Sequence, residues 1–193
     1  MQTETPLILA SKSPRRKAIL EMAGIPYIQC PGSIDENDFS GSPSDVVLHW
    51  ARMKAEDILP SWKDHPVLGA DTMVAIGDKL LGKPEDTMQA ENMLMELSGN
   101  WHNVYGGVCI IWPEKGIDFG FVESTRVHFR TLSTEEIRMY VSSGEPMDKA
   151  GAYGIQGIGC ALVDRVDGCY FNVMGLPITR LVHEFRIRLM NDV

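Results

Sequence analysis

A carboxylate inside an apolar stretch is the first group in this sequence that could do chemistry. Residues 67–76 predict a buried strand with Asp71 at its centre. A buried carboxylate is costly unless a cation or a hydrogen-bond donor meets it. A turn at residues 77–78 and a short strand at 80–81 predict a hairpin that carries Lys83 back towards Asp71. This acid and base suit a metal-bound phosphate; alternatively, Asp71 caps a bend and Lys83 is a surface charge.

A second group of charges lies at the start of a predicted helix. Ser13 and Pro14 are typical of an N-cap and a first helical position, and Arg15 and Arg16 follow in the first turn. Cations are disfavoured there by about 0.3–1 kcal/mol each, because they meet the positive end of the helix dipole. A docked anion would offset this cost, since free N–H groups and guanidiniums bind phosphate. The alternative is that both are solvated surface charges.

Two weaker signals lie between these stretches. Residues 34–38 form an acidic loop in which Glu36 could bind a divalent cation through hard oxygen atoms, unless the loop is simply solvated. A helix capped by Ser42 and running to about Leu59 places Lys54 on its apolar stripe. A lysine there either extends its charged end to solvent or points into a cleft.

Composition limits the classes of protein that this chain can belong to. At 193 residues we expect one domain spanning residues 1–193. A net charge of -8 argues against nucleic-acid binding through a broad basic face. Neither a long apolar run nor a leader is evident, which predicts a soluble, cytoplasmic protein without a membrane partner. Reduced, buried thiols are expected rather than disulfides at the four widely spaced cysteines, Cys30, Cys109, Cys160 and Cys169.

Strand and helix patterns alternate along the chain, which predicts a mixed α/β fold. Strands are expected at residues 7–10, 27–30, 67–76, 106–112, 119–129 and 160–166, the last turning at 167–168 into another strand at 170–173; helices are expected at 14–23, 42–59, 86–98, 133–143 and from 178 onwards. The glycine-rich segment 144–157 is predicted to be a binding loop. His102 has no nearby nucleophile, so a hydrogen-bonded structural histidine is expected.

Common catalytic motifs are missing. The sequence contains no G-x-x-x-x-G-K-[ST] phosphate loop, no suitably placed G-x-G-x-x-G turn and no G-x-S-x-G elbow. Carboxylates, lysines and arginines remain, together with an expected metal. These are the groups needed to activate water for attack at phosphorus.

Five ordered motifs resemble the Maf family of nucleoside triphosphate pyrophosphatases. They are Leu9–Arg16, Gly69–Thr72, Gly82–Pro84, Leu97–Gly99 and Glu145–Gly157. The resemblance implies a twisted mixed sheet with flanking helices and two lobes around a central cleft, similar to the inosine triphosphate pyrophosphatases and often homodimeric. It also implies cleavage of a nucleoside triphosphate to the monophosphate and pyrophosphate with Mg²⁺ or Mn²⁺.

The same resemblance implies roles for individual residues. Asp71 would accept a proton from water and bind the metal with Glu36, and the substrate would be bound by Ser13, Arg16, Lys54 and Lys83. Arg15, Thr72 and Gln156 match the subgroup that acts on dTTP and UTP. A sister subgroup acting on 7-methyl-GTP has tryptophan and glutamate at two of these three positions.

The chemistry of Gln156 favours the first subgroup. Its amide offers one donor and one acceptor, which complements the N3–H and a carbonyl of uracil or thymine, whereas guanine presents two adjacent donors. A buried amide left unpaired by the wrong base would cost on the order of 1–3 kcal/mol. Hydrolysis of modified pyrimidine nucleotides is an open variant of this function.

One departure from the family and one rival function stand beside this interpretation. Gly106 occupies a position where the family usually has threonine, which could alter turnover or metal affinity but not the fold. The rival is a nucleotide-sensing regulatory protein of cell division with little hydrolysis. Retention of Asp71, Lys83 and Gln156 favours catalysis, because a sensor needs no general base.

Overall fold

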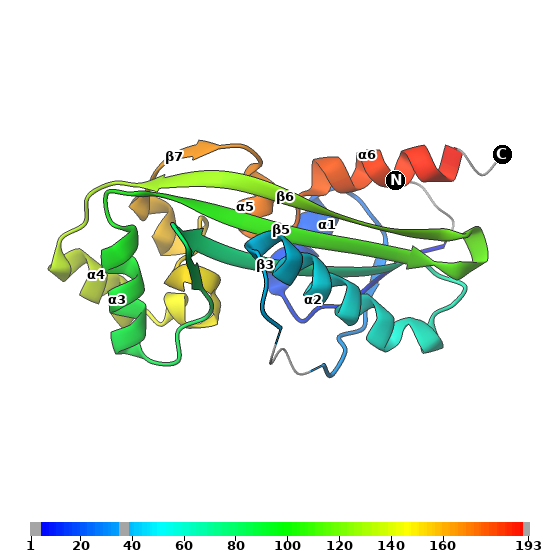
Figure 1. The fold of residues 1–193 in the computed structure, drawn as a ribbon, viewed down its shortest axis with the longest axis horizontal. Coiled ribbons are helices and arrows are strands. Elements are labelled where there is room, and N and C mark those ends of the chain that lie inside the picture. The colour runs from blue at the N-terminus through cyan, green and yellow to red at the C-terminus, as the bar shows by residue number, and fades with distance from the viewer. Residues whose placement is uncertain (1–4, 35–38, 191–193) are drawn as a thin grey trace. The chain divides into compact units, whose positions relative to one another are not determined.

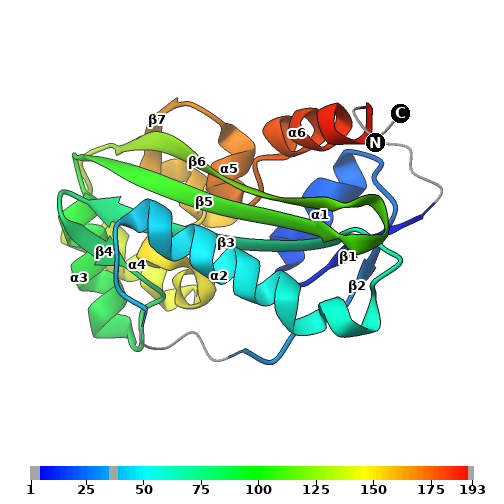
Figure 2. The same cartoon turned by 45° about the vertical axis from the view of Figure 1, so that its right-hand side comes forward.

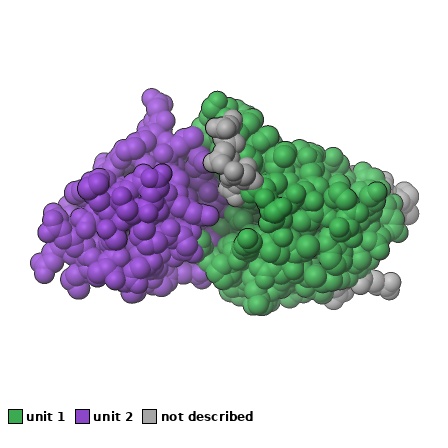
Figure 3. Space-filling view, turned by 90° about the horizontal axis from the view of Figure 1, so that it is seen from below, with its two compact units in different colours: residues 1–71, 106–123, 175–193 green, residues 72–105, 124–174 purple. Residues whose placement is uncertain are grey.

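The computed structural model describes residues 5–34 and 39–190. The chain divides into two compact units, which Figure 3 colours separately: unit 1 is residues 1–71, 106–123 and 175–193, and unit 2 is residues 72–105 and 124–174. This agrees with the expectation of two lobes, whereas a single domain over residues 1–193 stays a prediction.

The described residues form the expected mixed α/β fold. Seven of their strands make one sheet in the order β2-β1-β3-β5-β6-β7, with β4 paired to β3. The strands are β1 (Leu7–Leu9), β2 (Tyr27–Gln29), β3 (Val67–Ile76), β4 (Lys79–Leu81), β5 (Trp101–Trp112), β6 (Ile117–Phe129) and β7 (Val163–Asp167). The α-helices are α1 (Pro14–Met22), α2 (Pro43–Ile58), α3 (Thr87–Leu97), α4 (Thr134–Ser142), α5 (Tyr170–Met174) and α6 (Ile178–Met190).

In unit 1, helices α2 and α6 cover opposite faces of the sheet (Figure 2). A Cβ atom at Gly69 of β3 would overlap the carbonyl oxygen of Ala51 in α2, so glycine is what lets the helix approach this strand. On the other face, Trp112 of β5 stacks on Phe185 of α6 with ring centroids 6.2 Å apart. The first contact packs α2 directly against β3, and the second packs α6 against β5.

In unit 2, helices α3 and α4 lie side by side (Figure 1). Their inner residues, including Leu94 and Ile137, join Phe129 of β6 in one buried apolar cluster. The predicted hairpin is confirmed, because β3 and β4 pair antiparallel with Val74 opposite Leu81.

The prediction for residues 160–173 is wrong in part. Residues Gly157–Leu162 form 3-10 turns, and the expected strand at 170–173 is helix α5. The side chain of Asn172, which is fully buried, donates to the carbonyl oxygen of Val104 at 3.0 Å and to Thr125 Oγ1 at 3.1 Å. These distant contacts favour the helix over the strand that local alternation predicted.

The cysteines are free, as expected, but they are not all buried. Cys109 is buried, whereas Cys160 is exposed and Cys30 and Cys169 are intermediate. Within the described residues, no helix has both the length and the apolar composition that crossing a bilayer requires.

Candidate active site

Asp71 and Lys54 form an ion pair between strand β3 and helix α2 of unit 1. The Nζ atom of Lys54 lies 2.6 Å from Oδ1 of Asp71, and the two side chains are only 14% and 11% exposed. Gly69 lies two residues before Asp71, so both face α2, and the close approach at Gly69 brings Lys54 within reach. The expectation that Asp71 has a partner is confirmed, and the alternative that Lys54 extends to solvent is wrong.

The guanidinium of Arg16 is fixed beside the start of α1. Arg16 is 8% exposed, and its Nε donates to the carbonyl oxygen of Gly175 at 2.9 Å. Its Nη1 donates to Oγ of Ser11 at 3.0 Å. Ser13 caps the helix as predicted, accepting from the backbone N–H of Arg16 at 3.5 Å. Arg16 is therefore not a solvated surface charge, and Arg15 beside it is half-buried.

Three further candidates belong to unit 2. Thr72 follows Asp71 in β3 and is half-buried, whereas Lys83 after β4 is exposed. Gln156 is exposed as well, and its pairing with a nucleotide base stays a prediction. Gln156 lies directly before a 3-10 turn that begins at Gly157, where φ is 70°, and its side chain stays outside the core. Glu36 lies outside the described residues.

Comparison with known proteins decides the family. The family model described as "Maf-like protein" matches residues 6–187 of the chain. The chain belongs to the Maf-like protein family. The resemblance carried by the five motifs is thereby confirmed.

Relatives of this Maf-like protein carry names that state an activity. A dTTP/UTP pyrophosphatase of Bacillus cereus (strain AH820) is 48% identical over 181 residues, covering 93% of this chain and 94% of the relative. A dTTP/UTP pyrophosphatase of Syntrophomonas wolfei is 49% identical over 174 residues, covering 90% of this chain and 92% of the relative. The structure of the Staphylococcus aureus Ham1 protein aligns with a TM-score of 0.48 and 13% identity, covering 82% and 80% of the two chains.

His102 of this Maf-like protein is structural, as expected. It is 2% exposed, and its Nε2 lies 2.8 Å from the hydroxyl oxygen of Tyr153. Among the described atoms, its Nδ1 has no hydrogen-bond partner. Burial, with a smaller contribution from His128, lowers the pKa of His102 to about 4, so the ring is neutral at pH 7.

Sequence reasoning missed the role of Glu145 in unit 2. The carboxylate accepts hydrogen bonds from the backbone N–H groups of Ile158 at 2.9 Å and Gly159 at 3.0 Å. The Glu145–Gly157 motif indicated a loop carrying an acid, but no local pattern shows that this acid binds the backbone more than ten residues later. Only the short spacing of glycines, typical of backbone packed closely on another group, hinted at it.

Proposed function

We propose that this Maf-like protein hydrolyses dTTP and UTP to the monophosphate and pyrophosphate. The observation that carries the proposal is the buried Asp71–Lys54 pair, in a chain 48% identical over 93% of its length to a relative named dTTP/UTP pyrophosphatase. A carboxylate paired with a cation inside an apolar strand suits a general base better than a structural cap.

In this proposal Asp71 accepts the proton of the water that attacks the α-phosphorus. Lys54 holds the carboxylate through Oδ1, which fixes its orientation. A carboxylate has about four lone-pair positions on its two oxygens, so one bond from lysine leaves room for a water proton. Lys54 also places a positive charge where negative charge builds up on the phosphate.

The triphosphate would be bound by local cations. In unit 1, the guanidinium of Arg16 donates to the carbonyl oxygen of Gly175 and to Oγ of Ser11. Its charge and the N-terminus of α1 capped by Ser13 both attract phosphate. Lys83, which is exposed, is proposed as a further phosphate contact on the family resemblance. Local cations are needed because the whole protein is acidic, with a net charge of -8.

We propose Mg²⁺ or Mn²⁺ as the cofactor, held by Asp71 and by Glu36, which lies outside the described residues. Within residues 5–34 and 39–190, no group of three or more His, Cys, Asp or Glu side chains is arranged to hold a metal. The hard oxygen of Asp71 nevertheless fits Mg²⁺, which is commonly held by one or two carboxylates together with the substrate's phosphates. When bound, the ion would neutralise phosphate charge and act as a Lewis acid.

The base would be selected by Arg15, Thr72 and Gln156. The Gln156 amide complements the donor and acceptor of a pyrimidine dione. Because Gln156 is exposed, its selectivity would arise when a bound base covers it and a mismatched edge leaves it unpaired. We further propose a homodimer, on the family resemblance alone. From the composition and the net charge of -8, we propose a cytoplasmic protein without nucleic-acid or membrane partners.

The test is pyrophosphate release from dTTP, UTP, CTP, GTP, ATP and 7-methyl-GTP with Mg²⁺ or Mn²⁺. We expect release from dTTP and UTP, lowered by orders of magnitude in Asp71→Asn with nucleotide binding retained. Asp118→Asn is the matched control, because Asp118 also pairs with a cation of α2, Arg52, at 2.7 Å but is exposed. No release from any nucleotide, with heat protection retained, would instead indicate a nucleotide sensor.

A further inference from the structure

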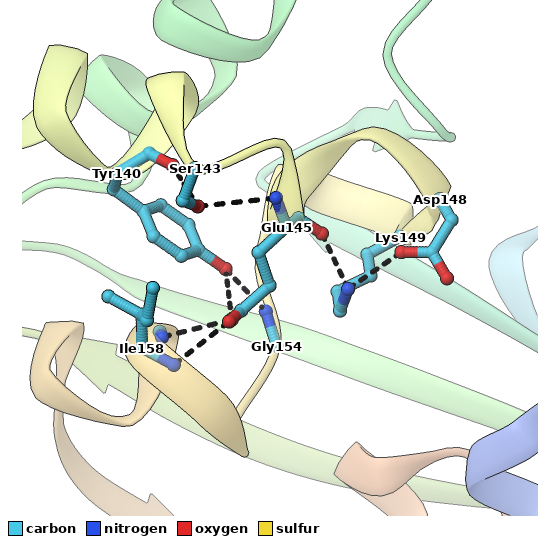
Figure 4. Close-up of polar contacts among 8 residues, drawn as sticks. Tyr140, Ser143, Glu145, Asp148, Lys149, Gly154 and Ile158 are labelled. Carbon is cyan, nitrogen blue, oxygen red and sulfur yellow. Dashed lines mark hydrogen bonds and ion pairs between the residues drawn. The ribbon is translucent and has the colours of Figure 1, made fainter.

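The segment 154–159, which carries Gln156, is anchored to the carboxylate of Glu145 (Figure 4). Oε2 of Glu145 accepts the backbone N–H of Ile158 at 2.9 Å, and Oε1 accepts that of Gly159 at 3.0 Å. Both donors lie within three residues of Gln156. The carboxylate therefore fixes the backbone immediately after the residue proposed to read the base.

Tyr140 extends this anchor to the other side of Gln156. Its hydroxyl donates to Oε1 of Glu145 at 2.9 Å and accepts the backbone N–H of Gly154 at 3.1 Å. Tyr140 belongs to helix α4 and is 3% exposed, so its ring is held by the core of unit 2. The segment is thus bound before and after Gln156 to one carboxylate and one phenol.

The glycines of this segment show how closely it lies against the anchor. Gly157 has a φ of 70°, and a Cβ atom there would lie 2.5 Å from Oε2 of Glu145. A Cβ atom at Gly159 would lie 2.6 Å from the hydroxyl oxygen of Tyr140. A side chain at either position would therefore force the anchoring groups or the segment to shift.

The charge of Glu145 strengthens these bonds. Burial by itself would raise the pKa of this carboxyl, but the N–H donors of Ile158 and Gly159, the Tyr140 hydroxyl and the Lys149 charge together lower it. Charged acceptors form hydrogen bonds that are about twice as strong as neutral ones. Lys149 also donates to the backbone oxygen of Glu145 and to Asp148, which fixes the turn from which Glu145 projects.

We propose that Glu145, with Tyr140, is a positioning residue that holds Gln156 in the geometry needed to select uracil and thymine. The proposal rests on the proposed function, in which Gln156 reads the base. The physical reason is that the exposed amide of Gln156 can distinguish one base from another only if its backbone is already fixed. On a mobile backbone, the amide would adjust to fit either base edge. Glu145 acts through the backbone and need not touch the nucleotide.

The test compares Glu145→Gln with wild type in two measurements. Glutamine keeps the size of the side chain but turns an NH₂ group towards one of the N–H donors, so the anchor loses its charge and at least one of its hydrogen bonds. We expect the ratio of kcat/KM for dTTP over CTP to fall about tenfold, mainly through KM. We also expect amide hydrogen exchange at Ile158 and Gly159 to accelerate at least about tenfold.

Two further variants keep the test decisive if Glu145→Gln folds poorly. Tyr140→Phe removes only the hydroxyl, and we expect smaller changes of the same kind, with faster exchange at Gly154. Ser133→Ala is the matched control, because Ser133 caps the same helix α4 but makes no bond to the segment. It should change neither the selectivity ratio nor the exchange at Ile158.

The outcomes separate this proposal from the proposed function. An unchanged selectivity ratio in a folded Glu145→Gln protein would overturn the positioning role, and so would an equal loss in Ser133→Ala. If wild type hydrolyses no nucleotide, the proposed function fails, but selectivity is then measured as heat protection by dTTP against CTP. If Glu145→Gln lost the difference in heat protection between dTTP and CTP, the positioning role of Glu145 would still be supported. If the variant kept this difference, the positioning role would be overturned.

Discussion

Lys54 of helix α2 donates a hydrogen bond of 2.6 Å to Oδ1 of Asp71, in the apolar middle of strand β3. Each charge alone would be costly at this depth, and the pair is tolerated because each partner meets the other. The arrangement depends on Gly69, whose missing side chain lets α2 contact the strand. The close packing of α2 on β3 therefore decides which cation meets Asp71.

Lys54→Met should destabilise the protein by about 3–5 kcal/mol, because it leaves the carboxylate of Asp71 buried without its cation. Chemical denaturation measures the loss. Arg52→Met is the control, since Arg52 pairs with the exposed Asp118 and should cost less than about 1 kcal/mol. Adding Asp71→Asn to Lys54→Met should restore part of the stability. A loss no greater than that of Arg52→Met would show that the pair is not desolvated.

Gly69→Ala should lower both stability and activity, because its methyl group would overlap the carbonyl oxygen of Ala51 and push α2 away from β3. Overpacking of this kind typically costs about 1–3 kcal/mol. Denaturation and pyrophosphate release would be measured together. Gly82→Ala serves as the stability control, because a Cβ atom there meets nothing within 4 Å. Equal stability of the two variants would contradict the close approach of α2.

The elements around Asp71 could be predicted because their signals are local. Ser42 and Asp45 form the capping box that starts α2, and the apolar stripe placed Lys54 inward. The turn at residues 77–78 predicted the hairpin in the same way. What local patterns could not give is which cation meets Asp71, since that depends on how α2 crosses β3.

The features that the sequence failed to predict depend on contacts between residues far apart in the chain. Hydrogen bonds from Asn172 to Val104 and Thr125, which lie far away in the sequence, stabilise this segment as a helix. Glu145 was noticed only as part of a loop, because its bonds to Ile158 and Gly159 are tertiary contacts. Residues whose role is set by distant partners leave no periodic signal.

The folded protein should lose stability as the pH falls from about 6.5 to about 4 through His102. Its pKa is lowered to about 4 by burial and, to a smaller extent, by His128, against an ordinary value of 6.5. Between about pH 6.5 and pH 4, the unfolded chain binds a proton at His102 that the folded ring does not. The free energy of unfolding is therefore unaffected by the titration of His102 above pH 6.5 and falls as the pH is lowered through this range. The difference between the ordinary and the lowered pKa of His102 corresponds to about 3 kcal/mol in the free energy of unfolding.

Denaturation of wild type and His102→Gln at several pH values between 4 and 7 measures this effect. Glutamine can still bond to the hydroxyl of Tyr153 but does not titrate, so the variant should show a flatter dependence of unfolding free energy on pH. We also expect His102→Gln to be less stable than wild type at pH 7, because glutamine packs differently from the buried imidazole ring. Parallel curves for the two proteins would remove His102 as the source of the acid sensitivity.

Arg16→Lys should weaken both the fold of unit 1 and the binding of nucleotide. The guanidinium spans two acceptors in different directions, the carbonyl oxygen of Gly175 and Oγ of Ser11, and an ammonium cannot reach both with the same geometry. One unsatisfied buried acceptor costs about 1–3 kcal/mol. Denaturation and the KM for dTTP would be measured, and we expect KM to rise more than kcat falls. Lys17→Arg is the control, because Lys17 is an exposed neighbour paired with Glu21. A normal KM in Arg16→Lys would mean that Arg16 only fastens α1 to the residues before α6.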